Sequence, residues 1–151
     1  MAARGAGRAT VSTVTLDGTS TSANVREAFA RETQSAARCL YFARRADVEG
    51  RADVAALLRA IAEGETGHAY GHLEFLEEAG DPLAGAGDTR GNIDSAIAEA
   101  ESNAEAYTGY AAAARQDKLP DIADWFESVA AAEQAHASVL KKTRRGLDAS
   151  R

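Results

Sequence analysis

A chain of 151 residues, 45% of them hydrophobic, is long enough to bury one core but too short for two domains of ordinary size. Its formal net charge of -6 argues against a protein that binds nucleic acid or anionic membranes, because both functions need clustered basic residues. The only cysteine, Cys39, excludes an intrachain disulfide and any metal site built from several thiolates, and it favours a cytoplasmic location.

Residues 1–20 are predicted to form a flexible N-terminal tail. The segment is rich in Ala, Gly, Ser and Thr and contains basic residues, but it lacks the apolar stretch of a secretory signal. Its basic, acid-poor character also resembles a transit peptide, although we favour the tail, partly extended at 11–16. Because no run of 18 apolar residues occurs anywhere in the chain, we expect no membrane-spanning helix.

Four long helices are predicted after the tail, because proline occurs only at positions 82 and 120 and glycine gathers between 80 and 91. The first helix has its N-cap at Thr21 or Ser22 and ends near Glu49, where Gly50 can adopt a left-handed closing conformation. The second covers about 52–79, the third begins between 89 and 92 and ends near 117, and the fourth covers about 120–145. The short connections within the first and last pairs require antiparallel hairpins, whereas the segment 81–90 is long enough to cross a bundle.

The second predicted helix carries polar residues on its apolar face. Apolar residues recur at three- and four-residue spacing between 54 and 76, and Glu65 and His68 lie on the same face. The fourth helix repeats this pattern, since Glu133 and His136 interrupt an apolar face between 122 and 140. A single Glu-x-x-His is typical of a solvated pair, but two such pairs in matching positions indicate a shared function.

The first and third helices supply one further glutamate each. Glu32 also interrupts an apolar line, and it lies 33 residues before Glu65. Glu99 lies 34 residues before Glu133, and we prefer it to the neighbouring Glu101 because it best preserves the spacing. A shifted register that uses Glu101 or Glu105 remains the alternative.

Metal ions explain why these carboxylates would share a core. Four unpaired carboxylates in a low-dielectric interior would repel one another, whereas two divalent cations balance their charge. An oxygen-rich set with one imidazole per ion suits Fe(II) best, with Mn(II) or a mixed Fe/Zn pair as alternatives. One Glu from each of two helices and Glu-x-x-His from the other two is the dimetal arrangement of ferritin-like bundles. We therefore predict an all-α, ferritin-like four-helix bundle over residues 21–146, made of two αα-hairpins joined by a longer crossover.

The predicted ligand set contains six residues, with His72 interpreted as a partly exposed histidine near the site rather than a ligand. Two of the glutamates would bridge the ions, two would bind as terminal ligands, and each histidine would bind one ion. The bridging residues are Glu65 and Glu133, the terminal ones Glu32 and Glu99, and the histidines His68 and His136.

The chain also resembles the rubrerythrin family, in the erythrin form that lacks a rubredoxin domain. The resemblance covers about residues 16–140 and rests on LDGT at 16–19, AFARETQ at 28–34, YFA at 41–43, DVEG at 47–50, AEGETGH at 62–68, IADWF at 122–126 and AEQAH at 132–136. It implies a ferritin-like bundle with a diiron centre that reduces hydrogen peroxide to water in oxidative-stress defence. It further implies an external, rubredoxin-like electron donor and a homodimer, in some relatives with exchanged helices.

Three positions matter for this resemblance. The family carries a second carboxylate three residues after the terminal ligand of the third helix, where this chain has Ser102. Losing that negative charge should raise the reduction potential and open a coordination position. Cys39 stands where relatives place a tyrosine, and we interpret it as a buried thiol that fills the core. Tyr107 matches the tyrosine of the third helix and is predicted to donate a proton or a hydrogen bond.

Two other functions remain open from the sequence. An iron-binding or storage protein could oxidise Fe(II) slowly without useful turnover. A dimetal oxygenase would need a large apolar pocket beside the metal ions, and alanine-rich helices do not predict one.

Overall fold

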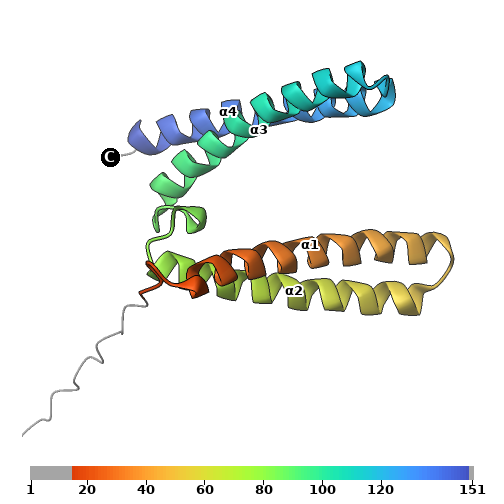
Figure 1. The fold of residues 1–151 in the computed structure, drawn as a ribbon, viewed down its shortest axis with the longest axis horizontal. Coiled ribbons are helices and arrows are strands. Elements are labelled where there is room, and N and C mark those ends of the chain that lie inside the picture. Colours follow the sequence, from red (N-terminus) through yellow and green to blue (C-terminus); the bar gives the residue numbers. More distant parts are fainter. Residues whose placement is uncertain (1–14, 150–151) are drawn as a thin grey trace, which may run out of the picture. The chain divides into compact units, whose positions relative to one another are not determined.

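The computed structural model describes residues 15–149 of the chain, and within that range it is entirely helical apart from turns. It contains α1 (Ser20–Val48), α2 (Ala52–Glu78), the short 3₁₀ helix η1 (Pro82–Ala84), α3 (Thr89–Gln116) and α4 (Pro120–Ala149). The four α-helices are labelled in Figure 1. The predicted all-α class is therefore confirmed. The predicted tail lies mostly in residues 1–14, outside the described range.

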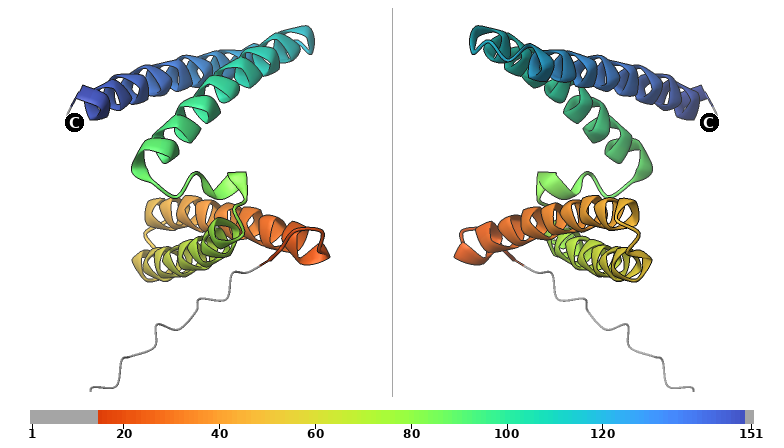
Figure 2. Two further views of the ribbon diagram at one scale, coloured as in Figure 1. Left: turned by 90° about the vertical axis from the view of Figure 1, so that its left-hand side faces the viewer. Right: turned by 90° about the vertical axis from the view of Figure 1, so that its right-hand side faces the viewer.

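The four helices form two hairpins, as predicted. The chain divides into two compact units, residues 1–84 and residues 85–151. Within the first unit α1 packs along α2, and within the second α3 packs along α4, as all views of Figures 1 and 2 show. None of the helices in residues 15–149 has an apolar stretch long enough to cross a bilayer.

The first helix begins earlier than predicted. Its N-cap is Thr19, not Thr21 or Ser22, and the Thr19 hydroxyl accepts a hydrogen bond from the backbone N–H of Ser22 at 3.3 Å. The run of Ser and Thr residues at 19–22 offers several possible caps, so the sequence alone could not select one. The last helix continues to Ala149 instead of ending near 145.

The same closing turn ends α1, α2 and α3. Gly50 and Gly80 adopt left-handed conformations, with φ of 73° and 72°, and Lys118 does so with φ of 60°. In each turn the next residue donates its N–H to a carbonyl five positions back, at 2.8 to 2.9 Å. Glycine adopts this conformation without steric cost, whereas in lysine the Cβ atom comes too close to the following carbonyl oxygen. Lys118 therefore occupies a strained position that corresponds to Gly50 in the first hairpin.

Replacing Lys118 by glycine should stabilise the protein by about 0.5–1 kcal/mol, because the substitution removes the Cβ clash. This gain is larger than the extra conformational entropy that glycine loses on folding. Urea unfolding of the metal-free protein would measure the gain. Lys118→Ala is the control, since it removes the same charge but keeps a Cβ. A glycine variant no more stable than the alanine variant would contradict a strained turn.

Alanine forms the seam between the helices of each hairpin. The buried alanines follow a spacing of seven residues along the helices, as in a coiled coil, and leave room for the two backbones to approach closely. All of them except Ala100 form six pairs, each 68 residues apart: Ala36 and Ala104, Ala43 and Ala111, Ala46 and Ala114, Ala55 and Ala123, Ala62 and Ala130, Ala69 and Ala137. The two hairpins are therefore structural repeats of one another.

Larger apolar side chains lie mainly beside the seam rather than in it. Leu76 is fully buried as predicted, but Ile61 is 42% exposed and Trp125 is 65% exposed. The apolar face predicted to bury Glu65 is thus only partly covered within the first hairpin. Glu32 and Glu65, which are half-buried, lie at the margin between the buried seam and this exposed face.

Candidate metal centre

The first hairpin gathers three of the predicted ligands. Glu32 lies on α1, and Glu65 and His68 lie on α2, one turn apart. One ligand atom from each of the three residues lies within 4.8 Å of the others. His68 Nδ1 is 3.2 Å from Glu65 Oε2 and 3.7 Å from Glu32 Oε2. No other group of three among residues 15–149 meets this condition.

Hydrogen bonds orient the two carboxylates of this trio. Ser35 donates its hydroxyl to Glu65 Oε1 at 3.2 Å, which leaves Oε2 facing His68. A hydrogen bond with Glu65, together with partial burial and the neighbouring negative charge, raises the pKa of Glu32. The same bond, followed by those from His68 and Ser35, lowers the pKa of Glu65. Without metal, Glu32 therefore loses its proton at a higher pH than Glu65 does.

The raised pKa of Glu32 predicts the behaviour of a Glu32→Gln variant without metal. A raised folded pKa gives stability that is present below the unfolded pKa and is lost as pH rises through the folded pKa. Glutamine keeps a neutral donor toward Glu65, so the metal-free variant should melt at or above the wild-type temperature at about pH 7. The difference should shrink toward about pH 4, where wild-type Glu32 is itself protonated.

Thermal melts in the presence of a chelator, followed by circular dichroism at several pH values, would test this expectation. Glu27→Gln is a suitable control, because Glu27 is an exposed residue of α1 that pairs with Arg31. A metal-free Glu32→Gln protein that melts below the wild type at neutral pH would contradict the raised pKa of Glu32.

The second hairpin brings its three predicted residues to one pocket but holds them less closely. Glu133 Oε2 and His136 Nδ1 of α4 are 3.4 Å apart. Glu99 of α3 lines the same pocket, with Ala96, Ala100, Asn103, Val139 and Leu140. A hydrogen bond from Asn103 or Ser102 to Glu133, equivalent to that of Ser35, is not among those found in the described residues. The donor atoms of the first hairpin are thus gathered in one place, whereas in the second hairpin only Glu133 and His136 lie close together.

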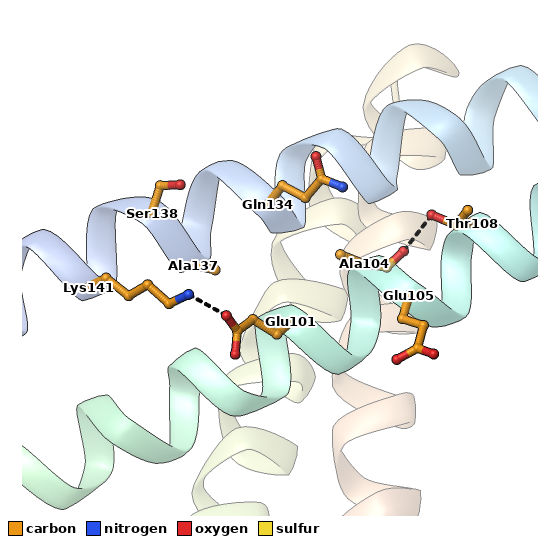
Figure 3. Close-up of a pocket in the computed structure, with 8 residues that line it drawn as sticks. All are labelled: Glu101, Ala104, Glu105, Thr108, Gln134, Ala137, Ser138 and Lys141. Atoms are coloured by element: carbon orange, nitrogen blue, oxygen red, sulfur yellow. Dashed lines mark hydrogen bonds and ion pairs between the residues drawn. The ribbon is translucent and has the colours of Figure 1, made fainter.

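The alternatives to Glu99 lie at a different pocket on the other side of the α3–α4 seam. Figure 3 shows Glu101 directed toward Lys141 of α4, with which it forms an ion pair. Glu105 lines the same pocket, beside Thr108, whose hydroxyl donates to the carbonyl of Ala104 at 2.8 Å. Neither glutamate lines the pocket of Glu133 and His136. This placement favours Glu99 as the third residue of the second trio.

A difference of one residue in register separates the two trios. The seam alanines and both Glu-x-x-His pairs repeat at 68 residues, but Glu99 follows Glu32 by 67. One residue corresponds to about 100° of rotation around a helix, so Glu99 cannot occupy the same position as Glu32. Ala100, buried in the seam, occupies it instead.

The same register identifies two residues that the sequence did not single out. Ser35 supports Glu65, and its counterpart 68 residues later is Asn103, which lines the second pocket. Ser102, which is predicted to replace the second carboxylate of the family's third helix, is exposed and does not line that pocket. The 68-residue repeat is the signal that could have identified Ser35 and Asn103.

The remaining candidates surround these trios. The charge of His72, which is half-buried, acts on the pKa of Glu32. Cys39 is half-buried rather than buried, and it lines a surface pocket with Ser35. Tyr107 packs against Phe126 and Tyr110, with ring centroids 5.7 and 5.6 Å away, and it does not line the pocket of Glu99.

The first trio fits a divalent first-row metal ion. Two carboxylates and one imidazole balance the charge of one such ion and are the oxygen and nitrogen donors it prefers. Donor atoms bound at about 2.1 Å and at right angles lie about 3 Å apart. The separation of 3.2 Å between His68 and Glu65 is already close to that value, and that of 3.7 Å between His68 and Glu32 is somewhat longer.

Comparison with known proteins gives a consistent result over most of the chain. The family model named Rubrerythrin matches residues 23–90 and 91–151. The chain is 34% identical to a rubrerythrin of Nitratidesulfovibrio vulgaris, over 80% of this chain and 67% of that protein. It is 33% identical to rubrerythrin-1 of Clostridium acetobutylicum, over 80% and 68%, and 28% identical to a rubrerythrin of Clostridium perfringens, over 88% and 74%.

Proposed function

Because the chain belongs to the rubrerythrin family, we propose that it is a non-haem diiron peroxidase that reduces hydrogen peroxide to water. The observation that supports this proposal most directly is the trio of Glu32, Glu65 and His68, whose donor atoms already lie together. The family match adds the expectation of iron over other first-row metals. The proposal includes a role in oxidative-stress defence.

The six proposed ligands comprise one glutamate and one Glu-x-x-His from each hairpin. Glu32, Glu65 and His68 come from the first, and Glu99, Glu133 and His136 from the second. When bound, the two metal ions supply Lewis acidity and the two electrons that reduce one peroxide, with two protons, to two water molecules. An external donor, such as a rubredoxin-like protein, then restores those electrons. Manganese or a mixed iron and zinc pair would occupy the same ligands.

The chain's own residues would bind the ions and handle protons. Because the pKa of Glu32 is raised in the metal-free protein, metal binding to its carboxylate should release protons, and more of them as the pH falls. Tyr107 is proposed as a proton or hydrogen-bond donor, and Tyr107→Phe would test that role by its effect on turnover without loss of metal. We further propose a cytoplasmic homodimer, with or without exchanged helices, which sedimentation would measure.

The absence of a carboxylate at both Ser102 and Asn103 should make the site more oxidising than the family norm. Adding a negative charge near the ions stabilises their higher oxidation state and lowers the reduction potential. We therefore expect Asn103→Asp, and to a smaller extent Ser102→Glu, to lower the potential. Redox titration of the iron-loaded proteins would measure it, and an unchanged or higher potential in both variants would contradict the expectation.

Reaction kinetics separate the peroxidase from its rivals. The iron-loaded protein is reduced without oxygen and mixed with hydrogen peroxide or with oxygen in a stopped-flow instrument. We expect faster oxidation by peroxide, followed by repeated turnover when a reductant is supplied. Much faster oxidation by oxygen would contradict the peroxidase. Slow oxidation without turnover would instead indicate an iron-binding or storage protein, and consumption of an organic substrate would indicate an oxygenase.

A further inference from the structure

We infer that the two metal ions bind in a fixed order, with the first at Glu32, Glu65 and His68 of the first hairpin and the second at the residues of α3 and α4. This order rests on the proposed function, because it assumes that both hairpins supply ligands. It adds that the two halves, although repeated in sequence, have different affinities.

The first hairpin needs little rearrangement to bind an ion. Its three donor atoms lie within 4.8 Å, and two of them are 3.2 Å apart, near the separation of neighbouring ligands around one ion. Ser35 holds one oxygen of Glu65, which directs the other toward His68. Side chains that are already ordered lose less conformational freedom on binding, so the affinity of the site is higher.

The second hairpin needs more rearrangement. Only Glu133 and His136 lie close together there, at 3.4 Å. Glu99 is displaced by one residue from the position that corresponds to Glu32, and that position is occupied by the buried Ala100. Its carboxylate lines the same pocket as Glu133 and His136, but the three donor atoms are not gathered as they are in the first hairpin. Binding an ion there needs more movement of side chains, so the affinity of the second hairpin is lower.

Solvent access does not account for the difference between the hairpins. The side chains of His68 and His136 are 66% and 67% exposed, and those of Glu65 and Glu133 are 24% and 21% exposed. The two Glu-x-x-His pairs are thus equally available to an ion. What differs is the position of the third carboxylate and the hydroxyl of Ser35.

The repeat provides a matched pair of variants for the test, His68→Ala and His136→Ala. The full-length, metal-free proteins are titrated with Co²⁺ alone, and binding is followed by calorimetry and by the visible absorption of bound Co²⁺. The wild type should bind two ions in two steps that differ in affinity by at least about tenfold. His136→Ala should keep the tighter step and lose the weaker one, whereas His68→Ala should lose the tighter step.

Two further variants guard against indirect effects. Glu32→Gln should remove the tighter step, and Glu99→Gln should preserve it. Circular dichroism of all four metal-free variants should match the wild type. Both histidines are mostly exposed, and glutamine has nearly the same size and shape as glutamate. These measurements do not depend on turnover, so they remain informative if no peroxidase activity is found.

The possible results distinguish the order of binding from the proposed function. Two steps of equal affinity, or a tighter step that persists in His68→Ala and disappears in His136→Ala, would overturn the order while leaving a dimetal protein. A wild-type chain that binds no Co²⁺ would overturn both the order and the proposed metal centre.

Discussion

Replacing Glu65 by alanine should lower peroxide turnover by more than about 100-fold and reduce the metal content to at most one ion per chain. Glu65 is the residue that joins the features of the first trio, since it contacts His68, raises the pKa of Glu32 and accepts the hydrogen bond of Ser35. Its removal therefore takes away a ligand and the group that orients two others. Glu133→Ala should have a similar effect through the second hairpin.

Metal analysis and steady-state peroxide assays would measure these losses. Glu63→Ala is the matched control, because Glu63 is an exposed glutamate of the same helix. Thermal melts with and without added metal provide a second readout. A bound ion at about 100 times its dissociation constant stabilises a protein by about 2.7 kcal/mol, and the Glu65→Ala protein should lack that increase. Full metal content in both variants would contradict the assignment of Glu65 and Glu133.

Overpacking the alanine seam should be the most damaging change to the fold itself. Ala55 and Ala123 are both 0% exposed and occupy corresponding positions in the two hairpins. Leucine at either position would force the paired helices apart, and we expect a loss of about 1–3 kcal/mol in the free energy of unfolding. Each alanine lies ten residues, or about 15 Å, from the Glu-x-x-His glutamate of its helix, so the folded fraction should still bind metal.

Chemical unfolding of the metal-free variants would measure the loss. Ala56→Leu serves as the control, because it introduces the same side chain at the neighbouring position, which is exposed. If Ala55→Leu and Ala56→Leu had the same stability, the close packing of α1 against α2 would not depend on alanine. Comparison of the two hairpins would also show whether they contribute equally to stability.

The sequence predicts the helices well because their limits are set by local chemistry. Gly50, Pro82 and Pro120 interrupt otherwise continuous helical tracts, and the structure places turns or helix ends at all three. The start of α1 is less well determined, since adjacent hydroxyl residues compete as caps and only the folded backbone shows that Thr19 is used. The length of α4 was underestimated because no proline stops it after its basic residues.

The candidate site is predicted in part, for a different reason. Periodicity identifies Glu65 and His68 because they interrupt an apolar face, and the structure places them beside Glu32. Periodicity cannot separate Glu99 from Glu101 in a helix rich in glutamate. That distinction depends on the partner helix, where Lys141 pairs with Glu101. Ser35 contributes through a contact between helices, which no pattern within one helix can reveal.

The left-handed Lys118 has a consequence for the history of this chain. The chain has the pattern expected of a hairpin that was duplicated and fused to its copy. The seam alanines, the closing turns and the Glu-x-x-His motifs all occur in pairs. The two copies have diverged unequally, because the second has a strained lysine where the first has Gly50, and its glutamate is displaced by one residue. Two copies of the first hairpin would present the same six ligand types without the strained turn or the displaced glutamate.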